Sequence, residues 1–153
     1  MPRFEEHFRL PVPRSQVWTF LQDYARVAPC MPGCESVTAI DADRFRARVS
    51  VKVGPVHTTQ ELSLTVTERR APERLASTAR GEDSRLGSRV AVESAIELRE
   101  AEPDAATDVS CVVDLRLTGP LATLGEAVMR AKSGQMVKAF AERLRAAIEQ
   151  ETR

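Results

Sequence analysis

The stretch FRARVSVKVGPV, residues 45–56, alternates apolar and polar side chains and then reaches a Gly-Pro pair before its last valine. A period of two is typical of a β-strand with one face covered by the rest of the protein and the other in water. Gly54 and Pro55 favour a tight turn, because glycine accepts a positive φ and proline presets its own φ. A second alternating run starts at Val56. The stretch therefore predicts a β-hairpin and an antiparallel sheet.

The alternation continues on both sides of this hairpin. Breaks rich in Gly, Pro and Asp separate the runs, and they are too short to hold the helix that a parallel connection needs. We therefore expect a meandering antiparallel sheet. The predicted strands are residues 4–12, a run that begins at residue 36, and residues 45–53, 56–66, 75–79, 90–98 and 107–117.

Three segments change to helical spacing, in which apolar residues recur every three or four positions. Two are short and follow the first strand: residues 14–22, and residues 23–27 with Asp23 as the N-terminal cap. The third starts at Leu121 and is predicted to run for about 30 residues. Only this long helix is large enough to cover the apolar face of the sheet. The predicted fold is α+β, a curved antiparallel sheet of about seven strands around the C-terminal helix.

Composition and charge narrow the classes of function. The length of 153 residues predicts a single domain, residues 1–153. The composition, with 42% hydrophobic and 29% charged residues, is typical of a globular protein. The 22 Lys and Arg residues balance 22 Asp and Glu residues, which argues against nucleic acid as a partner. No apolar run approaches the ~18 residues of a membrane span, and we see no signal peptide. With three cysteines, an odd number, the sequence predicts a cytoplasmic protein.

Several polar residues share the apolar face of the predicted sheet. A few small polar groups on an apolar wall suit an apolar ligand with a polar end, held in a cavity between the sheet and the helix. The same residues also fit a core without a ligand, in which each bonds locally or to buried water. The predicted lining residues are Thr58, Gln60, Leu62, Leu64, Val92, Ser94, Ile96, Cys111 and Val113 from the strands, and Val128, Met136 and Phe140 from the long helix.

Residue types that carry catalytic or metal chemistry are few and scattered. Cys30 and Cys34 have no second Cys or His pair nearby, so we expect neither a metal site nor a catalytic residue there. His7 and His57 are predicted to be solvated or locally bonded on their strands. The pair Glu82-Asp83 is predicted to lie in a solvated, glycine-bounded turn.

The polar side of the strand at residues 45–53 is basic. It carries Arg46, Arg48 and Lys52, with Arg44 just before them. A solvated outer face explains this stripe, and docking to an acidic partner or an anionic membrane surface is the alternative.

Four local motifs resemble those of a known family. They are VPRSQVWTFLQD at residues 12–23, CMPGCE at 30–35, VKVGPV at 51–56 and GPLATLG at 119–125. Together with the order of elements they resemble the CoxG family of carbon monoxide dehydrogenase subunits, within the SRPBCC superfamily of START and Bet v 1-like helix-grip domains. The motifs span nearly the whole chain. The most specific of them is the Pro-Gly-Cys-Glu turn followed by the Lys-Val-Gly-Pro hairpin.

The resemblance implies a non-catalytic accessory protein with an apolar cavity between sheet and helix. Family members are associated with molybdenum-containing hydroxylases such as carbon monoxide dehydrogenase, and are proposed to recruit that enzyme to the membrane or to carry a lipophilic quinone. A quinone or other lipid is thus the implied ligand, a molybdenum hydroxylase the implied partner, and no cofactor is expected. The alternatives are an enzyme of the polyketide cyclase or aromatase type, a general lipid-binding protein, and a scaffold with a closed core.

The resemblance also bears on the membrane. Longer relatives continue past the helix to a membrane-associating C-terminus, whereas this sequence ends at Arg153. We therefore expect a cytoplasmic protein whose contact with the inner face of the membrane is transient or peripheral.

Overall fold

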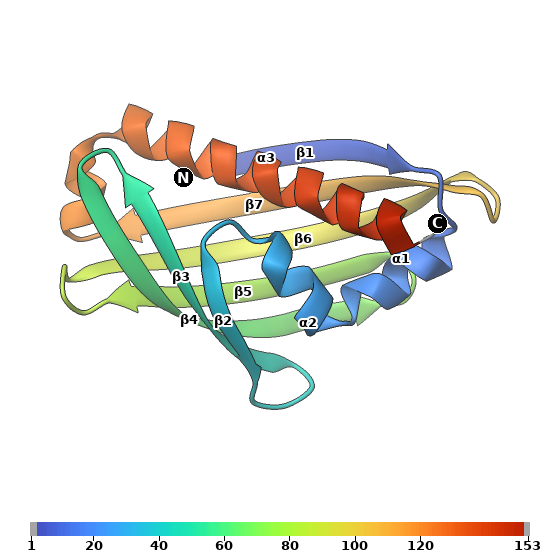
Figure 1. Cartoon of the computed structure of the whole chain (residues 1–153), viewed down its shortest axis with the longest axis horizontal. Helices are drawn as coiled ribbons and strands as arrows, with labels where there is room; N and C mark the ends of the chain where they lie inside the picture. Colours follow the sequence, from blue (N-terminus) through green and yellow to red (C-terminus); the bar gives the residue numbers. More distant parts are fainter. Residues whose placement is uncertain (1–2, 152–153) are drawn as a thin grey trace.

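The computed structural model describes residues 3–151 and shows one curved antiparallel sheet with a long helix across its concave face (Figure 1). The predicted order, a strand, two short helices, six strands and a long helix, is confirmed. The elements are β1 (Arg3–Leu10), α1 (Arg14–Leu21), α2 (Tyr24–Val27), the 3-10 helix η1 (Ala28–Cys30), β2 (Cys34–Ala39), β3 (Arg44–Val53), β4 (Val56–Arg70), β5 (Arg74–Asp83), β6 (Ser88–Glu102), β7 (Ala106–Thr118), the 3-10 helix η2 (Pro120–Leu124) and α3 (Glu126–Glu151).

The seven strands follow the order β1-β7-β6-β5-β4-β3-β2, and every neighbouring pair is antiparallel. Strands β2 to β7 therefore form the predicted meander, and β1 joins the free edge of β7. The predicted hairpin is confirmed, because Val53 pairs with Val56 across the turn at Gly54 and Pro55. Residues paired across strands lie on the same face, so the register assigns each side chain to the concave or the convex face.

Strand β5 is longer than predicted. It runs to Asp83 rather than ending at residue 79, and only the turn that follows it matches the predicted break. Backbone pairing explains the extension, because Gly81 pairs with Leu62 of β4 on one side and with Val90 of β6 on the other. Pairing on both edges overrides the low strand propensity of glycine and acidic residues. As a consequence, Asp83 ends a strand on the concave side.

The long helix is shorter than predicted at its start. The prediction that it begins at Leu121 is wrong, because Gly125 has φ 103° and ψ 145°, far outside the α-helical region. Residues Pro120–Leu124 form η2, and the α-helix starts at Glu126 and covers 26 residues. Its first turn closes with the Met129 amide donating to the Gly125 carbonyl at 3.1 Å.

Two turns hold the short helices in place. The Asp23 carboxylate accepts a hydrogen bond from the Ala25 amide at 3.1 Å, which confirms the predicted cap of α2. At the Pro32-Gly33 turn the glycine has φ 82°, and a Cβ there would lie 2.1 Å from the Ser50 carbonyl oxygen of β3. Only glycine allows this close approach of the turn to β3.

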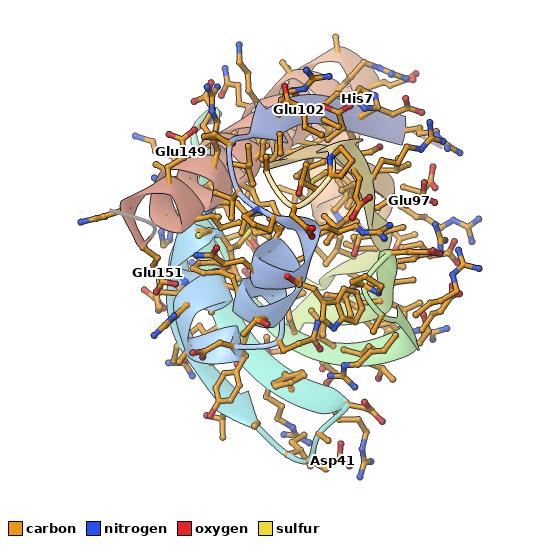
Figure 2. The ribbon with its side chains drawn as sticks, turned by 90° about the vertical axis from the view of Figure 1, so that its right-hand side faces the viewer. His7, Asp41, Glu97, Glu102, Glu149 and Glu151 are labelled. Atoms are coloured by element: carbon orange, nitrogen blue, oxygen red, sulfur yellow. The ribbon has the colours of Figure 1, made fainter. Side chains whose placement is uncertain are left out.

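A cluster of buried apolar residues lies at one end of the sheet. There α1, η1 and the C-terminal half of α3 pack against the adjoining ends of β1, β6 and β7. Seen from that end, the sheet curls around α1 (Figure 2). The buried members of this core are Leu10, Val12, Val17, Phe20, Leu21, Cys30, Leu98, Val109, Cys111, Leu144 and Ile148.

Candidate functional site

The helix α3 packs unevenly along the sheet. Its buried residues, Ala141, Leu144 and Ile148, all belong to its C-terminal half. In the N-terminal half the residues on the same side of the helix, such as Val137 and Met129, are only half-buried, and Val128 on the opposite side is 44% exposed. The helix is therefore fully packed against the rest of the protein only along its C-terminal half.

Beyond the core, the apolar side chains of the concave face are half-buried. Cross-strand register places them in continuous rows, such as Leu64, Ala79, Val92 and Leu115 across four strands. Apolar side chains in a completely packed core are buried, so a half-exposed apolar surface on the concave face of a sheet is unusual. The predicted ligand-lining residues that are half-buried on this surface are Leu62, Leu64, Val92, Ser94, Ile96 and Val113 from the sheet, and Met136 and Phe140 from α3.

Not all predicted lining residues lie on this open surface. Cys111 is 2% exposed and belongs to the buried core, against which Ile96 and Phe140 also pack. Val128 is exposed, while Thr58 and Gln60 are buried at the opposite end of the sheet from the core. On the concave face between them, the hydroxyls of Ser77 and Ser94 hydrogen-bond to one another at 2.8 Å.

A buried carboxylate organises the polar end of the concave face. Asp83 is 5% exposed, so the prediction that it lies in a solvated turn is wrong. Its Oδ2 accepts from the Thr58 hydroxyl at 2.9 Å and from the Thr59 amide at 3.1 Å. Its Oδ1 accepts from the amides of Arg85 at 3.0 Å and Leu86 at 3.3 Å. Four donors therefore occupy both oxygens.

These donors keep Asp83 ionised. Burial on its own would raise the pKa of Asp83, but hydrogen bonds from Thr58, Thr59 and Leu86 and the charge of Arg85 together lower it below the usual range. The alternation of residues along β5 indicates this burial, but the turn-rich composition around Asp83 favoured a solvated turn instead. Leu75, Ser77, Ala79, Gly81 and Asp83 share one strand parity, and the apolar members mark that parity as inward.

The Thr58 hydroxyl also receives a hydrogen bond. Gln60 Nε2 donates to Thr58 Oγ1 at 3.0 Å, which extends the chain from Asp83 through Thr58 to Gln60. The Gln60 side chain is 7% exposed, and among residues 3–151 no donor contacts its Oε1. A Cβ at Gly81 would lie 3.2 Å from this oxygen and 2.4 Å from Leu62 Cδ2, so glycine makes room for both side chains.

The three cysteines are free thiols. Burial, aided by the nearby charge of Glu6, raises the pKa of Cys111 to about 12. Burial also raises the pKa of Cys30 and that of Cys34, although Cys34 is only half-buried. Because the thiolate is the reactive form, none of these thiols is suited to act as a nucleophile near neutral pH.

Thiol labelling should separate the three cysteines. Near neutral pH we expect iodoacetamide to modify Cys34 slowly, while Cys30 and Cys111 react only in denaturant, because both are buried. Mass spectrometry of the intact protein and of its peptides measures the order. A Cys34→Ala variant is the control and should take up no label in the native state. Native labelling of Cys111 would contradict its place in the core.

The remaining candidate residues lie on the outside. His7 and His57 are exposed, as predicted. In the basic stripe, which is also exposed, Arg44 pairs with Asp41 at 2.7 Å and Arg48 with Glu61 at 2.7 Å. Nearby carboxylates thus neutralise two of the four basic residues of the stripe, Arg44 and Arg48. This favours a solvated outer face over a docking site for anions.

Two hollows open on other surfaces of the molecule. One, of about 470 Å³, lies against the outer side of β1, β7 and β6, near the His7 and Glu97 labels in Figure 2. The other, of about 400 Å³, lies beside Phe20, Arg26 and the C-terminal turn of α3. Neither is lined by a residue of the predicted site.

Comparison with known proteins agrees with this architecture. The family model for CoxG, described as a carbon monoxide dehydrogenase subunit, matches residues 7–149, nearly the whole described chain. The chain belongs to the CoxG family. No curated protein sequence matches it. Within residues 3–151 of this CoxG-family protein, no helix combines the length and apolar character needed to cross a membrane.

Solved structures show the same fold at low sequence identity. A conserved protein from Geobacillus kaustophilus superposes with a TM-score of 0.84 at 20% identity, covering 95% of this chain and 94% of that one. A START superfamily protein from Mycobacterium smegmatis gives 0.73 at 11% identity, covering 97% of each. The Zhui aromatase/cyclase from Streptomyces sp. R1128 gives 0.67 at 14% identity, covering 99% and 96%. The CoxG-family chain thus has the same helix-grip fold as these solved structures.

Proposed function

We propose that this protein binds a lipophilic ligand against the half-exposed apolar surface between the sheet and the N-terminal half of α3. The uneven packing of α3 is the observation that carries this proposal, since Leu144 is fully buried while Val137, two turns earlier on nearly the same side of the helix, is only half-buried. Contact between this apolar surface and water is unfavourable, and a bound apolar molecule would remove that contact. The CoxG family and its START-like fold point to the same class of ligand.

We further propose that the ligand is a quinone or similar lipid and that the protein serves a molybdenum-containing hydroxylase. The family description, a subunit of carbon monoxide dehydrogenase, supports the partner class. An apolar surface with a polar end suits an isoprenoid tail and a ring that carries oxygen atoms. In this proposal the protein works in the cytoplasm and meets the inner face of the membrane only peripherally.

The proposed role is non-catalytic. Four hydrogen-bond donors occupy the Asp83 carboxylate, which leaves no free lone pair for proton transfer in a reaction. The Cys111 thiol, with its pKa raised to about 12 by burial, is not a nucleophile either. Both groups stabilise the fold.

A cyclase-type enzyme is the second candidate. It is favoured by Glu6, a half-buried carboxylate that pairs in register with Cys111 on the concave side of the sheet. Turnover of an aromatic polyketide that Glu6→Gln abolishes would replace the binding role by this one.

Ligand uptake tests the binding role. Native mass spectrometry after mild extraction should show a bound lipid, or titration with a quinone should saturate. Val92→Trp and Val113→Trp should weaken uptake roughly tenfold, about 1.4 kcal/mol, by filling the half-exposed surface. Ser63→Trp, on the exposed convex face of β4, is the matched control and should bind as the unchanged protein does. If no lipid or quinone binds, or if all three variants bind equally, the proposed surface is wrong.

A further inference from the structure

The hydrogen-bond chain on β4 ends at an acceptor without a donor. Gln60 is 7% exposed, and its Oε1 has no hydrogen-bond partner among residues 3–151. Folded proteins satisfy nearly all buried polar atoms, because burying one without a partner costs free energy comparable to that of a lost hydrogen bond. Since Gln60 belongs to the predicted site, this oxygen is a candidate contact for a ligand.

The carboxylate of Asp83 determines which way the chain points. An ionised carboxylate only accepts hydrogen bonds, so the Thr58 hydroxyl must donate its single proton to Asp83 Oδ2, at 2.9 Å. The Thr58 oxygen can then only accept from Gln60, at 3.0 Å. The amide must therefore present Nε2 to Thr58, which leaves Oε1 as the end that faces a ligand. Rotating the amide by 180° would place two acceptors against each other.

The free oxygen lies at the inner end of the half-exposed apolar surface. It lies above Gly81, where an added Cβ would be 3.2 Å away, and that same Cβ would be 2.9 Å from Val90 Cγ1. The side chains of Leu62 and Val90, which flank Gly81 in the register, are half-buried rather than sealed into the core. For a ligand that lies along this surface to reach Oε1, the neighbouring Leu62 side chain has to move to another rotamer.

We propose that Gln60 Oε1 accepts a hydrogen bond from a hydroxyl group at the polar end of the bound ligand. The site then selects lipophilic molecules that carry a donor, such as a phenol or a hydroquinone, over molecules of the same shape whose oxygens only accept. This inference rests on the proposed function, because it concerns the ligand of that same surface. For a quinone ligand it means that the hydroquinone binds more tightly than the oxidised form.

A matched pair of ligands tests the selectivity. 4-Nonylphenol and 4-nonylanisole share the apolar tail and the ring, and only the phenol donates a hydrogen bond. By calorimetry on the full chain we expect the phenol to bind roughly tenfold more tightly, which corresponds to about 1.4 kcal/mol. Gln60→Met keeps the length of the side chain but removes the acceptor. In this variant the phenol and the anisole should bind with about equal affinity.

Two further variants test the chain of hydrogen bonds. Thr58→Val removes the hydroxyl that orients the amide, so the preference for the phenol should fall as it does in Gln60→Met. Thr58→Ser keeps the hydroxyl and should keep the preference. Circular dichroism and thermal unfolding check that each variant is folded. If Gln60→Met does not fold, the difference in phenol preference between Thr58→Ser and Thr58→Val tests the inference instead.

The outcomes distinguish this inference from the proposed function. If the anisole binds as tightly as the phenol, a water molecule satisfies Oε1 and the inference is wrong, while lipid binding stands. If the preference survives in Gln60→Met, the ligand donates to another group and the inference is again wrong. If neither molecule binds, the proposed function fails, and this inference fails with it.

Discussion

Leu144→Ala is expected to lower the free energy of unfolding by about 2–5 kcal/mol. Leu144 is fully buried, at 0% exposure, where the C-terminal half of α3 packs on the core. The substitution removes apolar contacts and leaves a cavity that close-packed neighbours cannot fill. Urea denaturation followed by circular dichroism measures the loss, provided that the slope of the transition stays unchanged.

The same helix supplies the matched control. Val128 is 44% exposed, and Val128→Ala should change the free energy of unfolding by less than about 0.5 kcal/mol. Equal losses for the two variants would mean that Val128 is packed as tightly as Leu144, which would contradict its exposure.

Asp83→Ala is expected to cost about 3 kcal/mol at neutral pH, because it removes the acceptor of four donors at once. The control is Glu82→Gln, since the Glu82 side chain is 62% exposed and pairs only loosely with Arg89 at 3.9 Å. That change should stay within about 0.5 kcal/mol. A small effect for Asp83→Ala would show that water replaces the carboxylate without loss.

The cost of Asp83→Ala should depend on pH in a defined direction. Hydrogen bonds hold the pKa of Asp83 below its usual range in the folded protein, so at low pH the unfolded chain takes up the proton first. The stability that Asp83 contributes is therefore present above about pH 4, the ordinary range of Asp, and is lost as the pH falls through the folded-state value. Urea unfolding at several pH values should show the wild-type and Asp83→Ala curves converging in acid. A constant difference would contradict an ionised Asp83 in the native state.

Strand alternation was enough to predict most of the fold. The hairpin at residues 45–56 and the runs that follow place inward and outward side chains without reference to any partner, because a strand has a strict period of two. The cap at Asp23 was predictable for a similar reason, since its contact with Ala25 is local. Errors arose where one residue mattered more than a pattern. At Gly125 the spacing of apolar residues continues, but the backbone leaves the helical region.

The candidate site was predicted less completely. Thr58 and Gln60 were placed on the inward face, but Asp83, which orders them, was assigned to a solvated turn because its neighbours in sequence are glycine and polar residues. Its donors come from positions as distant as Thr58, and only the pairing of β4 with β5 brings those positions together. Composition near one residue cannot indicate a hydrogen bond that a different strand supplies.

The sequence by itself determined the class of the fold, the order of its elements and the face on which each strand residue lies, because these follow from local periodicity and turn chemistry. The tertiary structure alone decided how far the concave face is filled and which polar atoms are satisfied. Those properties depend on where α3 lies against the sheet and on the register between strands. Leu144 and Val137 lie on nearly the same side of one helix, and only the packing around each makes the first part of the core and leaves the second half-buried.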